Sequence, residues 1–221
     1  MKNMKSIKSQ QSGFTLVEIA IVLVIIGLLL GGILKGQELI NSAKVKSFAQ
    51  DFRTIQTALY GYQDRFKALP GDHAAVVTQL PGPPAATLAL LPAGLQGNGQ
   101  INGDWDSVAP TEESCLVWQH LRMAGFLAGP TVVGCGAGND YLQKNADGGR
   151  IGISSTTQIA GMTGSFFICS SGILGKFARQ LDTQLDDGTT TTGAVRVALA
   201  ATPGTAIVPA DSDSTIVCLA F

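Results

Sequence analysis

Glu18 is the residue whose setting says most about the chemistry of this chain. It is the only charged residue in an apolar run from Phe14 to Leu34. A carboxylate in such a low-dielectric environment is costly, and it usually marks a function that involves a cationic partner. The sequence therefore indicates a functional charge whose partner must be identified.

Oxygen-rich side chains elsewhere could bind calcium. One group has the alternating spacing of an EF-hand loop, and its members are Asn98, Gln100, Asn102, Gly103, Asp104 and Asp106. The match is incomplete, because amides replace the first two acids and Ala109 stands where a bidentate glutamate is needed. We interpret the group as polar turns and keep Asn102, Asp104 and Asp106 as calcium candidates, with no other cofactor predicted. A second acidic group comprises Asp182, Asp186 and Asp187.

The cysteines predict disulfide chemistry. Cys115, Cys135, Cys169 and Cys218 all follow the apolar run. An even number in an exported segment suits disulfides formed in an oxidising compartment, and no Cys-x-x-Cys pair indicates zinc. Of the three possible connectivities we favour Cys115–Cys135 with Cys169–Cys218, which would join the C-terminal strand to the sheet. Free buried cysteines are the alternative.

Catalysis and nucleic-acid binding find no support in the residue pattern. His73 and His120 are far apart in the sequence, and no Ser-His-Asp or Cys-His arrangement is indicated. No glycine-rich phosphate loop precedes a helix, and the mildly acidic chain after the apolar run has no basic aromatic patch. We therefore predict that the protein is not an enzyme, and the sequence carries no strong nucleic-acid signal.

The apolar run is long enough to cross a bilayer, since about 20 helical residues cover roughly 30 Å of hydrocarbon. Fifteen of its residues are Leu, Ile, Val or Phe. These favour insertion by roughly 4.5–9 kcal/mol, against about 3 kcal/mol for one acid. Lys2, Lys5 and Lys8 precede the run, which predicts a cytoplasmic N-terminus and export of the chain after Leu34. A cleaved secretory signal and a plain single-pass anchor are the alternatives.

Beyond the run, the spacing predicts that the same helix continues to Leu69. Apolar residues alternate at intervals of three and four, which is one face of an α-helix, at Val45, Phe48, Phe52, Ile55, Leu59, Tyr62 and Phe66. No proline interrupts residues 14–69, and Pro70-Gly71 then ends the helix. A helix of roughly 80 Å is too long for one soluble core. We therefore expect one half in lipid or a filament core and the other against a globular head; a plain coiled coil is the alternative.

The composition of residues 70–221 predicts that head. Strands are expected at residues 151–154, 165–169, 194–199 and 215–221, and helices at 111–126 and 173–185. The predicted fold class is α+β, with the long N-terminal helix packed on a small antiparallel sheet. The predicted domains are the N-terminal segment 1–13, the long helix at 14–69 with its transmembrane part at 14–34, and the head at 70–221.

The start of the chain resembles a known family. Lys8-Ser-Gln-Gln-Ser-Gly13 followed by Phe14-Thr-Leu-Val-Glu18 is similar to the leader and first mature residues of type IV prepilins and type II secretion pseudopilins. The shared features are a short basic leader, the glycine, the phenylalanine and a glutamate at the fifth position after the cut. The resemblance implies the pilin architecture, in agreement with the predicted α+β class.

The resemblance implies that a prepilin peptidase cleaves between Gly13 and Phe14 and methylates the new amine of Phe14. The resemblance thus makes residues 1–13 a leader that is removed. This leader holds three lysines and no acid, so its removal changes the formal charge from −1 to −4. The resemblance also names the partner of Glu18, the N-terminal amine of a neighbouring subunit. An α-amine has a pKa of about 7.7–8.0 and is largely cationic at neutral pH.

We therefore expect a structural subunit of a type IV pilus or pilus-like filament that polymerises through its N-terminal helix. The implied partners are copies of the chain or related pilins, prepilin peptidase, an inner-membrane assembly platform with its ATPase, and the lipid bilayer. The implied location is the inner membrane before assembly, and the cell surface or a periplasmic pseudopilus afterwards. Alternatives are a pseudopilin of a type II secretion system, a minor or initiating pilin, and, from a different class, a membrane-anchored binding module.

Overall fold

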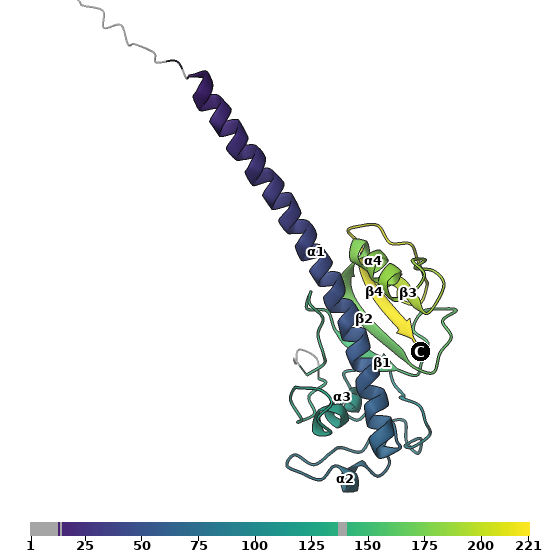
Figure 1. The fold of residues 1–221 in the computed structure, drawn as a ribbon. Coiled ribbons are helices and arrows are strands. Elements are labelled where there is room, and N and C mark those ends of the chain that lie inside the picture. Colours follow the sequence, from purple (N-terminus) through teal and green to yellow (C-terminus); the bar gives the residue numbers. More distant parts are fainter. Residues whose placement is uncertain (1–12, 14, 137–140) are drawn as a thin grey trace, which may run out of the picture. The chain divides into compact units, whose positions relative to one another are not determined.

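The structure, a computed structural model, describes residue 13, residues 15–136 and residues 141–221 (Figure 1). The elements in chain order are α1 (Leu16–Phe66), α2 (Val76–Gln79), α3 (Glu113–Met123), β1 (Ile151–Ser154), β2 (Phe167–Leu174), α4 (Gly175–Leu185), β3 (Val195–Leu199) and β4 (Ser214–Ala220). The chain forms two compact units, Met1–Ser42 and Ala43–Phe221, and α1 contributes to both. The predicted α+β class is confirmed.

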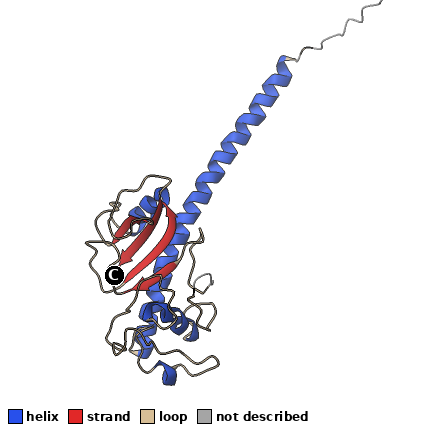
Figure 2. Cartoon of the chain, turned by 180° about the vertical axis from the view of Figure 1, so that it is seen from behind, coloured by secondary structure: helices blue, strands red, loops and turns tan. Residues whose placement is uncertain are grey.

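The four strands of the second unit form one antiparallel sheet in the order β1-β2-β4-β3 (Figure 2). Alternate side chains point to opposite faces of a sheet, and this divides the apolar core in two. Ile168 of β2 and Val217 of β4 belong to the larger core cluster, which includes the buried stripe of α1. Their neighbours Phe167 and Ile216 belong to a smaller cluster that also includes Trp105.

From Val45 onward, α1 lies across one face of the sheet (Figures 1 and 2). Its buried residues are Val45, Phe48, Ala49, Phe52, Ile55, Ala58, Leu59 and Tyr62. The predicted apolar stripe is thus confirmed, except that Phe66 at its end is only half-buried. Burying one large apolar side chain contributes roughly 1.5–3 kcal/mol, so this stripe is the main attachment of α1 to the head.

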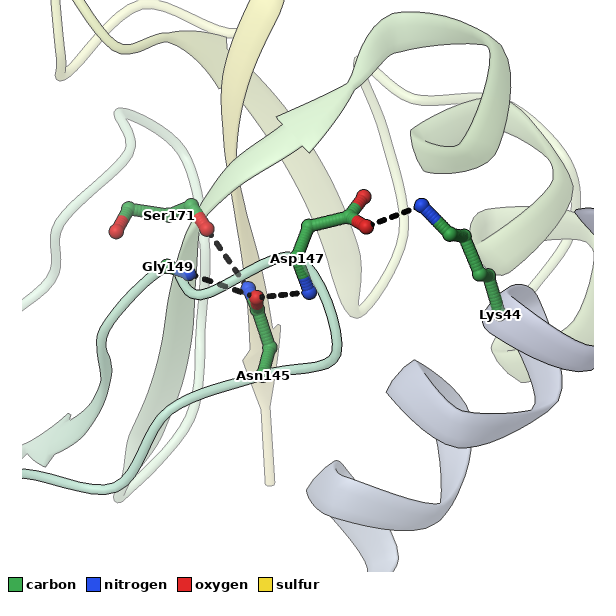
Figure 3. Close-up of polar contacts among 5 residues, drawn as sticks. All are labelled: Lys44, Asn145, Asp147, Gly149 and Ser171. Carbon is green, nitrogen blue, oxygen red and sulfur yellow. Dashed lines mark hydrogen bonds and ion pairs between the residues drawn. The ribbon is translucent and has the colours of Figure 1, made fainter.

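A loop before β1 adds a polar attachment at the start of the stripe (Figure 3). Asn145 organises the loop, because its Oδ1 accepts the backbone N–H groups of Asp147 and Gly149 at 3.0 and 2.9 Å. Its Nδ2 donates to the carbonyl of Ser171 in β2 at 2.8 Å. Asp147 then pairs with Lys44 of α1 at 2.5 Å, and the two side chains are only 16% and 38% exposed. Water therefore screens this ion pair less than it screens a surface pair.

Two histidines that are far apart in the sequence meet at Tyr62, near the end of α1. The Tyr62 hydroxyl shares a 2.7 Å hydrogen bond with His73 Nδ1, and its ring stacks on that of His120 at 6.4 Å between centroids. His120 Nδ1 accepts the backbone N–H of Gly71 at 2.8 Å, so its Nε2–H donates to the carbonyl of Thr87 at 2.9 Å. Burial lowers the pKa of His120 to about 4. The ring is therefore neutral at neutral pH and joins α3 to two loops.

The structure contains the two disulfides that the sequence analysis favoured. Cys115 of α3 is bonded to Cys135 in the following loop, with 6.1 Å between Cα atoms. Cys169 and Cys218 face each other across β2 and β4, with 4.1 Å between Cα atoms. The second bond joins the C-terminal strand to the sheet, as expected.

The predicted ends of two helices were wrong by two or three residues. The long helix ends at Phe66 instead of Leu69, because Lys67 adopts a left-handed conformation with φ of 54° and turns the chain before Pro70. The helix predicted at 111–126 spans Glu113–Met123. The short helix α2 was not predicted at all.

The boundary between β2 and α4 was also misplaced. We expected a strand at 165–169 and a helix from residue 173, but β2 runs to Leu174 and α4 begins at Gly175. After a register shift that follows Ser171, Ile173 and Leu174 still pair with β4. The hydrogen bond from the Thr215 hydroxyl to the Ile173 carbonyl, at 2.7 Å, supports this extension. Pairing with a distant strand thus overrides the local helical pattern.

Removal of the Cys169–Cys218 disulfide, by replacing both residues with Ala, is expected to cost more stability than the same change at Cys115 and Cys135. The first pair is separated by 49 residues and the second by 20. Loop-closure entropy then gives costs of roughly 4 and roughly 3 kcal/mol. Denaturant unfolding of the full chain in detergent measures both values. If removal of the Cys115–Cys135 disulfide costs more unfolding free energy, loop-closure entropy does not determine which disulfide stabilises the protein more.

His120→Gln is expected to remove part of the acid sensitivity of folding. The folded-state pKa of His120, about 4, lies below its unfolded value of about 6.5, so its contribution to stability is complete above pH 6.5 and is lost as the pH falls towards 4. Between about pH 7 and about pH 4, the wild type should lose up to roughly 3 kcal/mol of unfolding free energy relative to the variant.

The difference between the two proteins is the quantity to measure. Burial raises the pKa of Asp51 and of Asp182 to about 6, and these groups favour the folded state at lower pH. They are present in both proteins, so their effects cancel in the difference. A difference in unfolding free energy that does not change with pH would contradict a neutral, buried His120.

Candidate functional site

Glu18 lies in the first turn of α1 and forms a capping box with Thr15. The backbone N–H and the hydroxyl of Thr15 both donate to Glu18 Oε2, at 2.8 and 2.7 Å. In return, the backbone N–H of Glu18 donates to Thr15 Oγ1 at 3.3 Å. The box provides partners for N–H groups that the start of a helix otherwise leaves unpaired. It also holds the carboxylate at the end of the helix whose dipole favours negative charge.

Thr15 is a hydrogen-bond partner of Glu18 that was not predicted from the sequence. The signal was present, because Thr15-Leu-Val-Glu18 has the Ser/Thr-x-x-Glu spacing of a capping box. An ionised carboxylate has about four acceptor sites, and the box uses two of them on one oxygen. Glu18 can therefore stabilise its own helix and still accept a cation.

The apolar side chains that follow Glu18 are exposed. Every Leu, Ile and Val from Leu16 to Leu34 is at least 46% exposed. Helix α1 contains a window with a mean hydropathy of 2.8, long and apolar enough to cross a membrane, and no residue of that window is buried. An apolar surface of this extent is unfavourable in water. It is suited to lipid or to the helices of other molecules.

The expected cleavage site is described only in part. Gly13 is exposed and lies outside any helix or strand. Phe14, the expected first residue of the mature chain, and residues 1–12 of the predicted leader lie outside the described residues.

The calcium candidates at residues 98–106 lie in hydrogen-bonded turns. Asn102 donates from its backbone N–H and from Nδ2 to Oε2 of buried Glu113, both at 2.8 Å. The carbonyl of Asp104 accepts the backbone N–H of Ser107 at 3.0 Å. Within the part of the chain that the structure describes, Asp104 and Asp106 do not gather with a third acidic, histidine or cysteine side chain. Asn102 thus serves as a hydrogen-bond donor to α3.

The second acidic group does come together. Asp182, Asp186 and Asp187 each place one carboxylate oxygen within 4.8 Å of the others. Asp182 lies one helical turn before Asp186, which is why α4 and its C-terminal cap bring the side chains together.

Comparison with protein families gives a match at the N-terminal end of the chain. Residues 8–34 match the family model described as the prokaryotic N-terminal methylation motif. The match spans the end of the predicted leader, Glu18 and the exposed apolar part of α1, and it leaves the head uncovered. Searches of curated proteins and of solved structures found no match.

The matched segment and the fold agree with each other. A prepilin-type methylation motif at the N-terminus leads into an exposed apolar helix, and the same helix then packs on a four-stranded antiparallel sheet. The chain is therefore a type IV pilin-like protein, and its N-terminal methylation motif indicates the type IV pilin and pseudopilin family.

Proposed function

We propose that the protein is a structural subunit of a type IV pilus or pilus-like filament. It is made as a membrane-anchored precursor, is cleaved between Gly13 and Phe14, and polymerises through α1. The observation that carries the proposal is the exposed apolar surface of α1 with Glu18 at its N-terminal end, within the matched motif. Proteins with this motif are generally structural subunits and not enzymes.

The charge of Glu18 supplies the register of assembly. In a bundle of apolar helices, an unpaired carboxylate and an unpaired amine are each costly, and the two attract strongly. Because the capping box leaves acceptor sites on Glu18 free, the methylated amine of a neighbour's Phe14 can bind without unwinding the helix. A subunit out of register would leave both charges unpaired.

The glycines of the exposed segment support packing between molecules. A Cβ atom placed on Gly27, Gly31, Gly32 or Gly36 would meet no atom within 4 Å. Each glycine costs about 1 kcal/mol of helix stability relative to alanine, and no close contact within the described chain offsets this cost. Small residues at a spacing of four allow helices to approach closely in an apolar medium.

The proposed location follows from the charge before the helix. Lys2, Lys5 and Lys8 hold the leader on the cytoplasmic side, so the head faces the periplasm before assembly. Its two disulfides suit an oxidising compartment. The partners are other subunits, the prepilin peptidase, and the inner-membrane platform with its ATPase. Immunogold labelling of surface fibres would distinguish a pilus from a periplasmic secretion pseudopilus.

Mature protein from cells is expected to begin with N-methylated Phe14. Gly13→Val should block cleavage, because the family motif requires glycine before the cut, and the unprocessed chain should remain in the membrane. N-terminal sequencing and intact mass measure both results. Gln11→Ala is the matched control in the leader and should be processed normally. A wild-type chain that begins at Met1 would refute this processing step.

Variants of the capping box separate the two roles of Glu18. Glu18→Gln keeps a side chain that fits the box but removes the charge, so filament yield should fall at least roughly tenfold, because one buried charge loses its partner. Thr15→Ala removes the hydroxyl cap and keeps the charge. It should weaken the helix start by about 1 kcal/mol and leave most filaments intact.

Sheared filaments quantified by immunoblot, with membrane levels of the subunit as the control, give the readout. Normal assembly of Glu18→Gln would contradict the charge pair. Equal loss in Thr15→Ala and Glu18→Gln would show that Glu18 acts through helix capping alone.

A further inference from the structure

The C-terminal end of α4 carries three carboxylates that the proposed function does not use. Asp182 lies in the last turn of α4, Asp186 is the residue that caps the helix, and Asp187 follows. One oxygen of each lies within 4.8 Å of the others. Three like charges this close repel one another unless a proton or a cation compensates them.

Asp182 is the unusual member of the group. Its side chain is 0% exposed. Neither of its carboxylate oxygens has a hydrogen-bond partner among the residues that the structure describes. Buried carboxylates are normally hydrogen-bonded or bound to metal, because an unsatisfied one costs several kcal/mol. This side chain therefore requires a ligand that the protein atoms around it do not supply.

The other two carboxylates are held in place by backbone N–H groups. Asp186 Oδ2 accepts the N–H of Val195, the first residue of β3, at 3.0 Å. Asp187 Oδ1 accepts the N–H of Thr189 at 2.8 Å. Gly193 has a φ of 75°, and a Cβ atom there would collide with Asp186 Oδ2, 2.0 Å away. The glycine in this loop thus leaves space for the Asp186 carboxylate, and the backbone N–H groups orient Asp186 and Asp187 without a bound ligand.

The electrostatic setting favours a cation. The C-terminal end of a helix carries partial negative charge, and α4 has no basic residue in its last turn. Burial, followed by the charges of Asp186 and Asp187, raises the pKa of Asp182 to about 6. The ionised group is therefore unfavourable in the protein alone and would be stabilised by a bound cation.

We propose that Asp182, Asp186 and Asp187 form a calcium-binding site that ties the end of α4 to the loop before β3. Calcium takes oxygen ligands at 2.3–2.6 Å in flexible geometry, so ligand oxygens up to about 5 Å apart can share one ion. Magnesium needs shorter distances and a near-ideal octahedron, and zinc prefers nitrogen and sulfur. The site does not depend on whether the protein forms filaments.

The test uses the full chain in detergent micelles. Calcium at about 5 mM should raise the thermal unfolding midpoint of the head by roughly 5 °C relative to excess EDTA, as expected for a site with a Kd near 10⁻⁴ M. Calorimetric titration should give one calcium per chain, and magnesium at the same concentration should give a smaller shift.

Asp182→Asn should abolish the calcium-dependent shift. In EDTA this variant should unfold at the same temperature as the wild type or higher, because it removes an unpartnered buried charge. This result would show that Asp182→Asn folds normally and that it has lost only the response to calcium. Asp64→Asn, an exposed acid on α1, is the matched control and should keep the full shift.

Asp104→Asn with Asp106→Asn tests the other acidic segment and should also keep the shift. The proposal is overturned if the wild type shows no calcium response, or if Asp182→Asn retains it. It is equally overturned if the response is lost in the Asp104 and Asp106 variant instead.

Discussion

The free energy of exposing the first part of α1 to water is the constraint on which the rest of this protein depends. No residue from Leu16 to Lys44 is buried, whereas the stripe from Val45 to Tyr62 is covered by the head. Burial of each large apolar side chain is worth roughly 1.5–3 kcal/mol, so the exposed part requires lipid or other helices. The buried part fixes the head to α1. The same helix is thus exposed in its first part and buried against the head in its second part. Its residue pattern changes between these parts, from a continuous apolar run to an apolar stripe with polar residues between.

Exchange of lipid for neighbouring helices gains little hydrophobic free energy, because both surroundings are apolar. Specificity must therefore come from shape and charge. In the proposed filament, the glycines of the exposed segment would allow close approach, and Glu18 would provide the charge. Within a single chain, the capping box with Thr15 gives the Glu18 carboxylate hydrogen-bond partners in its own helix. These hydrogen bonds lower the free-energy cost of the charge.

The head keeps its shape by cross-links between segments that are distant in the chain. Three kinds of interaction join elements that local structure alone would not hold together. They are the two disulfides, the Lys44–Asp147 ion pair and the hydrogen bonds of His120. The proposed calcium site at the end of α4 belongs to the same class of interaction. These links add to the stability that the two apolar clusters of the head provide.

The sequence by itself determined the features that arise from local pattern. The apolar run, the three-four stripe from Val45 to Tyr62, strand β1 and the leader motif all follow from residue type and spacing. The capping box also follows from the spacing of Thr15 and Glu18. Tertiary structure alone decided that β2 continues to Leu174 and that His73 and His120 meet at Tyr62. It also decided that Asp182 is buried with no hydrogen-bond partner among the residues that the structure describes. The physical reason is that strand pairing and burial depend on contacts between distant segments, which spacing along one segment does not encode.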